Sequence, residues 1–118
     1  MSATEAPAPT IRNTGTRPAR PRKLFVNIPV SDLQRSIDFF EQLGFTFNLQ
    51  FTDATATCML VGEDAYFMLL TPDKFASFIF RPVAPSAKET GAMYASSVAS
   101  RAEVDDIVTK ALAAGGSK

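Results

Sequence analysis

Few residues of this chain have side chains that could catalyse a reaction. The 118 residues include no histidine and a single cysteine, Cys58. A cysteine nucleophile usually needs a neighbouring base, most often histidine, to form its thiolate. Cys58 lies between Thr57 and Met59 in an apolar segment, where a buried thiol is the ordinary interpretation and a reactive one the alternative. The sequence therefore predicts no catalytic residue.

Carboxylates are the other groups that could hold a metal ion. A zinc, nickel or iron site without imidazole needs several carboxylates or thiolates close together. The acidic residues instead fall in predicted turns and on polar helix faces, among them Asp38, Glu41, Glu63, Asp64, Asp105 and Asp106. The sequence therefore predicts neither a metal site nor a cofactor.

Ligand recognition is better supported than catalysis. Asn27 is a polar residue within an apolar strand pattern, and its amide could bind a ligand carbonyl or amide. A hydrogen bond to nearby main chain is the alternative for Asn27. The chain also has ten phenylalanines. Most of them are expected in the core, and a stacking pocket for an aromatic ligand is the second interpretation.

A strand and a helix within residues 24–45 organise the predicted fold. The apolar residues of 24–29 alternate with others, as in a strand. Ser31 and Gln34 have the spacing of a capping box that opens a helix. Gly44 is typical of the turn that ends such a helix.

An antiparallel meander is predicted to follow this helix. Its three strands are expected over residues 46–52, 55–61 and 65–71. Thr71 and Pro72 then indicate the start of a short helix around residues 73–78. The proline-containing segment 81–91 indicates a linker.

Residues 92–118 look like an unfinished second copy of the first unit. A weaker strand pattern over residues 92–99 precedes a second capping box at Ser100 and Glu103, and Gly115 is expected to end the helix. Three strands follow the first helix, whereas none is predicted after the second. The chain is therefore expected to be a fragment, or a subunit that a partner chain completes, if this symmetry holds.

The composition of residues 1–22 predicts a disordered, basic, proline-rich tail, because these residues have too little apolar surface to fold. The basic residues up to the first strand are Arg12, Arg17, Arg20, Arg22 and Lys23. A flexible solubilising extension is favoured over a transit peptide, and the absence of interleaved aromatic residues argues against nucleic-acid binding. No apolar run is long enough for a membrane span, and the single cysteine suits the reducing cytoplasm.

The segment VSDLQRSIDFF and the LGF after it resemble the start of a vicinal oxygen chelate domain. This superfamily includes glyoxalases, bleomycin and fosfomycin resistance proteins, and extradiol dioxygenases. The resemblance implies an α+β fold of two βαβββ modules whose sheets curve around a shared cavity. Residues 23–118 would form the glyoxalase-like domain, with a complete first module (23–80), a linker (81–91) and an incomplete second module (92–118).

The resemblance also implies where a metal ion would bind in related proteins. Metal-dependent members have a ligand on the first strand at the position of Phe25 and a glutamate on the fourth strand at the position of Leu69. A histidine of the second module would fall near Met93, and the substrate-binding arginine of lactoylglutathione lyases falls on Pro29. Because these positions are apolar here, the resemblance implies a protein without a bound metal.

The leading hypothesis is a metal-free protein that binds a small, mostly apolar molecule in the curve of its sheet. The predicted lining consists of Phe25, Asn27, Phe67, Leu69 and Met93. A glyoxalase-type lyase or isomerase, or a dioxygenase-like enzyme, is one alternative, and an incomplete subunit is the other. The expected partners are the small molecule and a further protein chain, either a second copy or another subunit, with neither nucleic acid nor a membrane.

Overall fold

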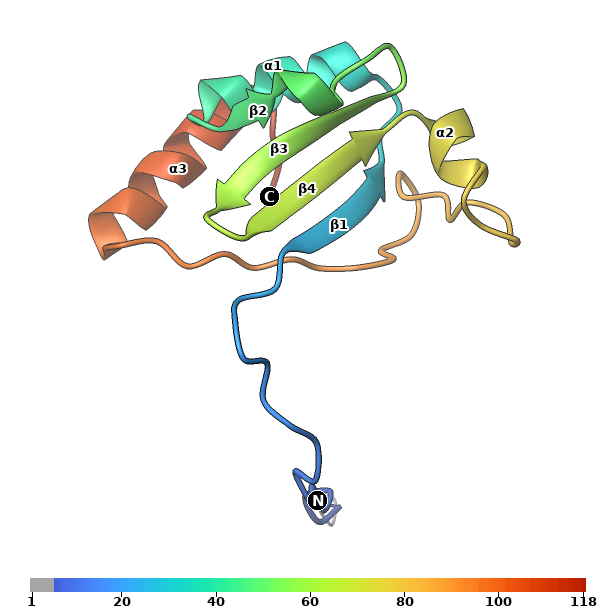
Figure 1. The fold of residues 1–118 in the computed structure, drawn as a ribbon. Helices are drawn as coiled ribbons and strands as arrows, with labels where there is room; N and C mark the ends of the chain where they lie inside the picture. Colours follow the sequence, from blue (N-terminus) through green and yellow to red (C-terminus); the bar gives the residue numbers. More distant parts are fainter. Residues whose placement is uncertain (1–5) are drawn as a thin grey trace, which may run out of the picture.

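The computed structural model describes residues 6–118, so residues 1–5 of the predicted tail lie outside the described residues. Residues 6–22 form neither helix nor strand, are exposed, and lead away from the folded part of the chain (Figure 1). The disorder expected for this tail stays a prediction. Within residues 6–118, no helix combines the length and apolar character needed to cross a bilayer.

The chain folds into a four-stranded sheet with helices. In chain order the elements are β1 (Leu24–Pro29), α1 (Leu33–Gln42), β2 (Thr46–Asn48), the 3-10 helix η1 (Leu49–Phe51), β3 (Ala56–Gly62), β4 (Ala65–Leu70), α2 (Pro72–Ala76) and α3 (Arg101–Ala113). The sheet order is β1-β4-β3-β2, with β1 parallel to β4 and the other pairs antiparallel. The predicted α+β class and the βαβββ module are confirmed.

The two faces of the sheet have different surroundings. Successive side chains of a strand point to opposite faces, and the strand register shows which residues share a face. The face that we call the helix-side face carries Val26, Ile28, Thr57, Met59, Phe67 and Leu69. The face that we call the open face carries Phe25, Asn27, Cys58, Leu60, Tyr66 and Met68. Figure 1 shows α1 behind the sheet; Thr57, Met59 and Leu69 of the helix-side face are almost completely buried, as is Cys58 of the open face.

Helix α1 begins one residue later than the sequence predicts. Its N-cap is Asp32 rather than Ser31, and the Asp32 carboxylate accepts a hydrogen bond from the Arg35 main-chain N–H at 3.1 Å. Gln34, the predicted partner of Ser31, donates instead to the Asp38 carboxylate at 2.8 Å. Serine and aspartate are comparable caps, but the negative charge of Asp32 also interacts favourably with the positive end of the helix dipole.

The prediction of a strand over residues 46–52 is correct for residues 46–48 and wrong for the residues after them. Strand β2 ends at Asn48, whose side-chain oxygen accepts a hydrogen bond from the Gln50 main-chain N–H at 3.0 Å. This local bond turns the chain into η1, because asparagine side chains compete with strand pairing for main-chain donors.

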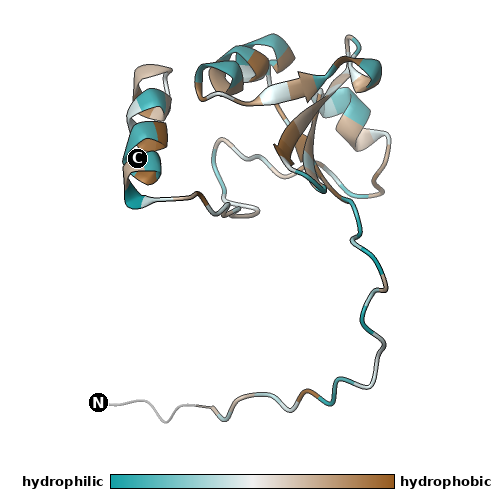
Figure 2. Cartoon of the chain, turned by 60° about the vertical axis from the view of Figure 1, so that its left-hand side comes forward, coloured by the Kyte–Doolittle hydropathy of each residue, from teal (hydrophilic) through white to brown (hydrophobic). Residues whose placement is uncertain are grey.

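The predicted strand over residues 92–99 is not formed, although the helix after it is present. The segment contains neither helix nor strand, and its alanines and serines have low strand propensity. Ser100 caps α3 as predicted, accepting a hydrogen bond from the Glu103 main-chain N–H at 3.2 Å. The Glu103 carboxylate accepts from the Ala99 N–H at 2.8 Å, one residue before the expected donor. Figure 2 shows hydrophilic and hydrophobic residues interspersed along α3.

Gly44 ends α1 in a left-handed conformation, with a φ of 98°. Its main-chain N–H donates to the Glu41 carbonyl, and that of Phe45 donates to the Phe40 carbonyl, each at 3.0 Å. This pair of main-chain hydrogen bonds is a Schellman motif. The Phe40 and Phe45 rings also pack edge to face. The predicted helix end is confirmed.

Replacing Gly44 with alanine is expected to lower the free energy of unfolding by roughly 1–2 kcal/mol, because a Cβ is strained at positive φ. Urea denaturation followed by circular dichroism measures the change. The matched control is Gly91→Ala, since Gly91 has no positive φ and open space around its Cα. Equal changes in the free energy of unfolding for the two substitutions would show that the left-handed conformation of Gly44 does not contribute to stability.

Candidate functional site

The five residues predicted to line a ligand site do not form one surface. Register pairs Phe25 with Tyr66 and Asn27 with Met68, so these four side chains share the open face. Phe67 lies on the helix-side face instead. The side chains that a ligand would meet beside Phe25 and Asn27 are therefore those of Tyr66 and Met68, which the sequence prediction missed.

Of the remaining predicted residues, Phe67 and Leu69 lie on the other face of the sheet and Met93 lies outside the strands. Leu69 is buried on the helix-side face, and Phe67 makes an edge-to-face contact with Tyr94, with ring centroids 5.1 Å apart. Met93 is exposed in the segment that does not form a strand. Met68, rather than Leu69, takes the place on β4 beside Asn27. A shift of one residue moves a side chain to the other face of a sheet, so Leu69 does not share a face with Asn27.

The open face carries a pair of stacked aromatic rings. The centroids of Phe25 and Tyr66 are 4.9 Å apart, and the ring planes differ by 14°. Phe25 is 49% exposed, and Leu60 on β3 is partly exposed on the same face. The exposed Asn27 amide donates only a long bond, 3.4 Å, to the Phe25 carbonyl. An apolar ring surface therefore lies beside a polar amide.

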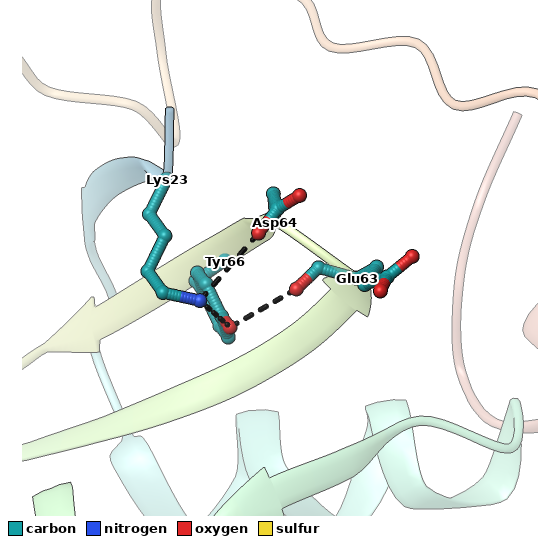
Figure 3. A network of polar contacts seen from close by, with 4 residues as sticks. All are labelled: Lys23, Glu63, Asp64 and Tyr66. Carbon is teal, nitrogen blue, oxygen red and sulfur yellow. Dashed lines mark hydrogen bonds and ion pairs between the residues drawn. The ribbon is translucent and has the colours of Figure 1, made fainter. Parts of the chain in front are cut away.

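Lys23 fixes the position of the Tyr66 ring (Figure 3). Its ammonium donates to the Tyr66 hydroxyl at 3.3 Å and to the Asp64 carboxylate at 3.5 Å, and the Tyr66 hydroxyl donates to the Glu63 carbonyl at 3.2 Å. The bond to Tyr66, reinforced by Asp64, raises the pKa of Lys23 above its ordinary value. Because the ion pair is exposed, its main effect is to orient the ring rather than to stabilise the fold.

Cys58 also belongs to the open face but is buried in the middle of the sheet. Burial raises the pKa of its thiol, which disfavours the reactive thiolate. Among residues 6–118, no group of three or more histidine, cysteine or acidic side chains is placed to hold a metal ion. The side chains at this face can stack and donate hydrogen bonds.

A groove of about 370 Å³ continues from Asn27 past the end of β1. Its lining includes Phe75 of α2, Tyr94 and the segment around Val83. A larger cavity, about 600 Å³, lies between α1 and Gly115 and is lined mainly by polar side chains of the helix. The smaller groove shares Asn27 with the open face, and its lining is more apolar.

Two comparisons with known proteins agree with this geometry. A family model described as bleomycin resistance protein-like, N-terminal, matches residues 22–62, which include β1, α1, β2 and β3. A hypothetical protein from S. aureus has a similar structure, with a TM-score of 0.67 and 23% sequence identity over 82% of this chain and 72% of that one. At this identity the likeness shows the fold alone. No curated protein matches the chain in sequence. Residues 22–62 are therefore similar to the N-terminal part of bleomycin resistance protein-like proteins, and the βαβββ topology of the chain agrees with this similarity.

Proposed function

We propose that this chain is a bleomycin resistance-like binding protein that holds a small, planar and mostly apolar molecule against the open face of its sheet. The observation that carries the proposal is the stacked Phe25–Tyr66 pair, which leaves one aromatic surface half exposed beside the Asn27 amide. Aromatic surfaces favour offset or edge-to-face contact with other rings, and a single amide can orient the ligand.

The chemistry of the open face favours binding over catalysis. Lys23, with its raised pKa, is a protonated donor near neutral pH, and the Asn27 amide does not titrate. A general base needs a pKa near the working pH, and neither side chain has one. Phe25 and Leu69 are apolar at the positions where the resemblance places metal ligands of related proteins, so the proposed binding uses no metal. The free Cys58 thiol suits the proposed cytoplasmic location.

Intrinsic tyrosine fluorescence can measure this binding, because the chain has two tyrosines and no tryptophan. In a Tyr94→Phe variant the emission reports Tyr66 alone. Titration with bleomycin and with a panel of planar aromatic compounds is expected to quench Tyr66 emission to saturation with at least one of them. Linear quenching without saturation by every compound would contradict the proposal.

Replacing Phe25 with alanine is expected to weaken the binding of such a compound by about tenfold or more, which corresponds to about 1.4 kcal/mol of lost stacking and burial. Phe51→Ala is the matched control, because Phe51 is an exposed phenylalanine on η1. Both variants should keep the wild-type circular dichroism spectrum. The same affinity in wild type and Phe25→Ala would show that the ligand binds elsewhere.

A further inference from the structure

A further groove, which we call the α3 groove, lies between helix α3 and the end of the sheet that carries β2. It has a volume of about 460 Å³. Both of its walls are mostly apolar: α3 provides Val104, Ile107 and Val108, and the first module provides Leu43, Phe45 and Leu60. Val104 is 47% exposed and Val108 is 48% exposed, so the chain itself leaves much of this apolar surface uncovered. The groove therefore has room for another molecule.

Both walls of the α3 groove are held by contacts with α1. On one wall, the Phe45 ring packs edge to face against Phe40, with ring centroids 5.8 Å apart. On the other, the Gly116 main-chain N–H donates to the Ala111 carbonyl at 2.8 Å, which places Gly116 beside the Phe39 ring at the C-terminal end of α3. A groove with fixed walls favours binding, because less order has to be created when the ligand enters.

Among residues 6–118, Glu103 is the one charged side chain that lines the α3 groove. Its carboxylate accepts a hydrogen bond from the Ala99 N–H through Oε2, at 2.8 Å. Neither of the salt bridges found within the described residues includes Glu103. Arg101 is the nearest basic residue along the chain, but residues two positions apart on a helix do not face each other. The Glu103 carboxylate is therefore available to a positively charged group.

We propose that the α3 groove binds a primary amine with an aliphatic chain, which lies between the two apolar walls while its ammonium group pairs with Glu103. The other polar side chains of the lining are the hydroxyls of Thr46, Ser96 and Ser97, whose oxygens can accept further hydrogen bonds from an ammonium group. The carboxylate of a fatty acid would instead be repelled by Glu103. This site is separate from the open face, with which it shares Leu60, and does not depend on the ligand proposed there.

Calorimetric titration with octylamine, octanol and octanoate tests the choice of headgroup, because these compounds share the same chain length. Octylamine is expected to saturate one site and to bind about fivefold more tightly than octanol, the gain that one exposed ion pair provides. Octanoate should bind most weakly. Hexylamine should bind less tightly than octylamine, by roughly two- to fourfold for each CH₂ group removed. Octanoate binding as tight as that of octylamine, or octylamine binding that does not saturate, would overturn the proposal.

The Glu103→Gln variant tests the ion pair itself. It should lower the affinity for octylamine about fivefold, to that of octanol, and leave the affinity for octanol unchanged. Glutamine can still accept the hydrogen bond from the Ala99 N–H, so the start of α3 should be preserved. Asp105→Asn is the matched control, because it removes the same charge from α3 at a residue outside the groove lining. Equal losses of octylamine affinity in the two variants would show general charge attraction and overturn the proposal.

Two further variants locate the bound chain. Val104→Ser/Val108→Ser should weaken octylamine and octanol alike by at least about tenfold, because one apolar wall is lost. Leu112→Ser is its control, since Leu112 is a partly exposed residue of α3 outside the groove lining. Phe25→Ala should weaken the planar compounds of the open face but not octylamine. Loss of octylamine binding in Phe25→Ala would place the amine on the open face and overturn this proposal. Saturable octylamine binding without saturation by any planar compound would instead overturn the proposed function alone.

Discussion

Replacing Leu69 with alanine is expected to lower the free energy of unfolding by about 2–5 kcal/mol. Leu69 is 1% exposed and pairs with Thr57 in the middle of the sheet, so the shorter side chain leaves a cavity against the helix side. Urea denaturation should show a lower midpoint with an unchanged dependence on urea concentration, which indicates a loss of stability without a change of structure.

Leu49→Ala is the matched control for this experiment, because it makes the same chemical change at a residue that is 81% exposed. Its effect on the free energy of unfolding is expected to stay within about 0.5 kcal/mol. The comparison also decides the role of Leu69. If Leu69→Ala were as stable as wild type but lost ligand affinity, Leu69 would line the site rather than the core.

Cys58 is expected to react with Ellman's reagent roughly 100-fold more slowly, or slower still, in the folded protein than in urea, since a core thiol reacts only when the structure opens. The thiol is almost completely buried, and burial raises its pKa, so both access and thiolate formation are reduced in the native state. The absorbance of the released thiolate measures the rate at a mildly alkaline pH.

A Cys58→Ser/Leu49→Cys variant provides the reference for an exposed thiol. Its rate should be similar with and without urea, because position 49 is already open to solvent. Rapid labelling of wild-type Cys58 in the absence of urea would mean that the centre of the sheet is accessible. Such a result would restore the reactive-thiol interpretation of this residue.

Local signals in the sequence predicted most of the elements correctly. The Gly44 turn depends on neighbouring residues, as do the caps at Thr71 and Ser100, and all three are present in the structure. Two errors arose where local signals compete. Ser31 and Asp32 are both favourable N-cap residues, and only the structure shows that Asp32 is the N-cap of α1. Asn48 fits the alternating pattern of a strand but uses its side chain to end that strand.

Only the β1 part of the candidate site could be predicted from the sequence, and the reason is different. Phe25 and Asn27 alternate with the apolar residues of β1, so their common face follows from one strand alone. Their partners on β4 depend on the register between two strands about forty residues apart in the chain, which no local pattern contains. Counting back from the end of β4 selected Leu69, whereas the pairing places Met68 beside Asn27.

Strand β1 lies at an edge of the sheet with the main-chain groups of Phe25, Asn27 and Pro29 facing outward, which has a consequence for association with other strands. A sheet with a free edge can add strands without limit, and such growth leads to filaments. Here the ring nitrogen of Pro29 bears no hydrogen, and the Asn27 amide occupies a neighbouring acceptor, so strand addition at this edge is disfavoured. The edge of β1 can thus border the apolar open face with less tendency to recruit strands of other chains.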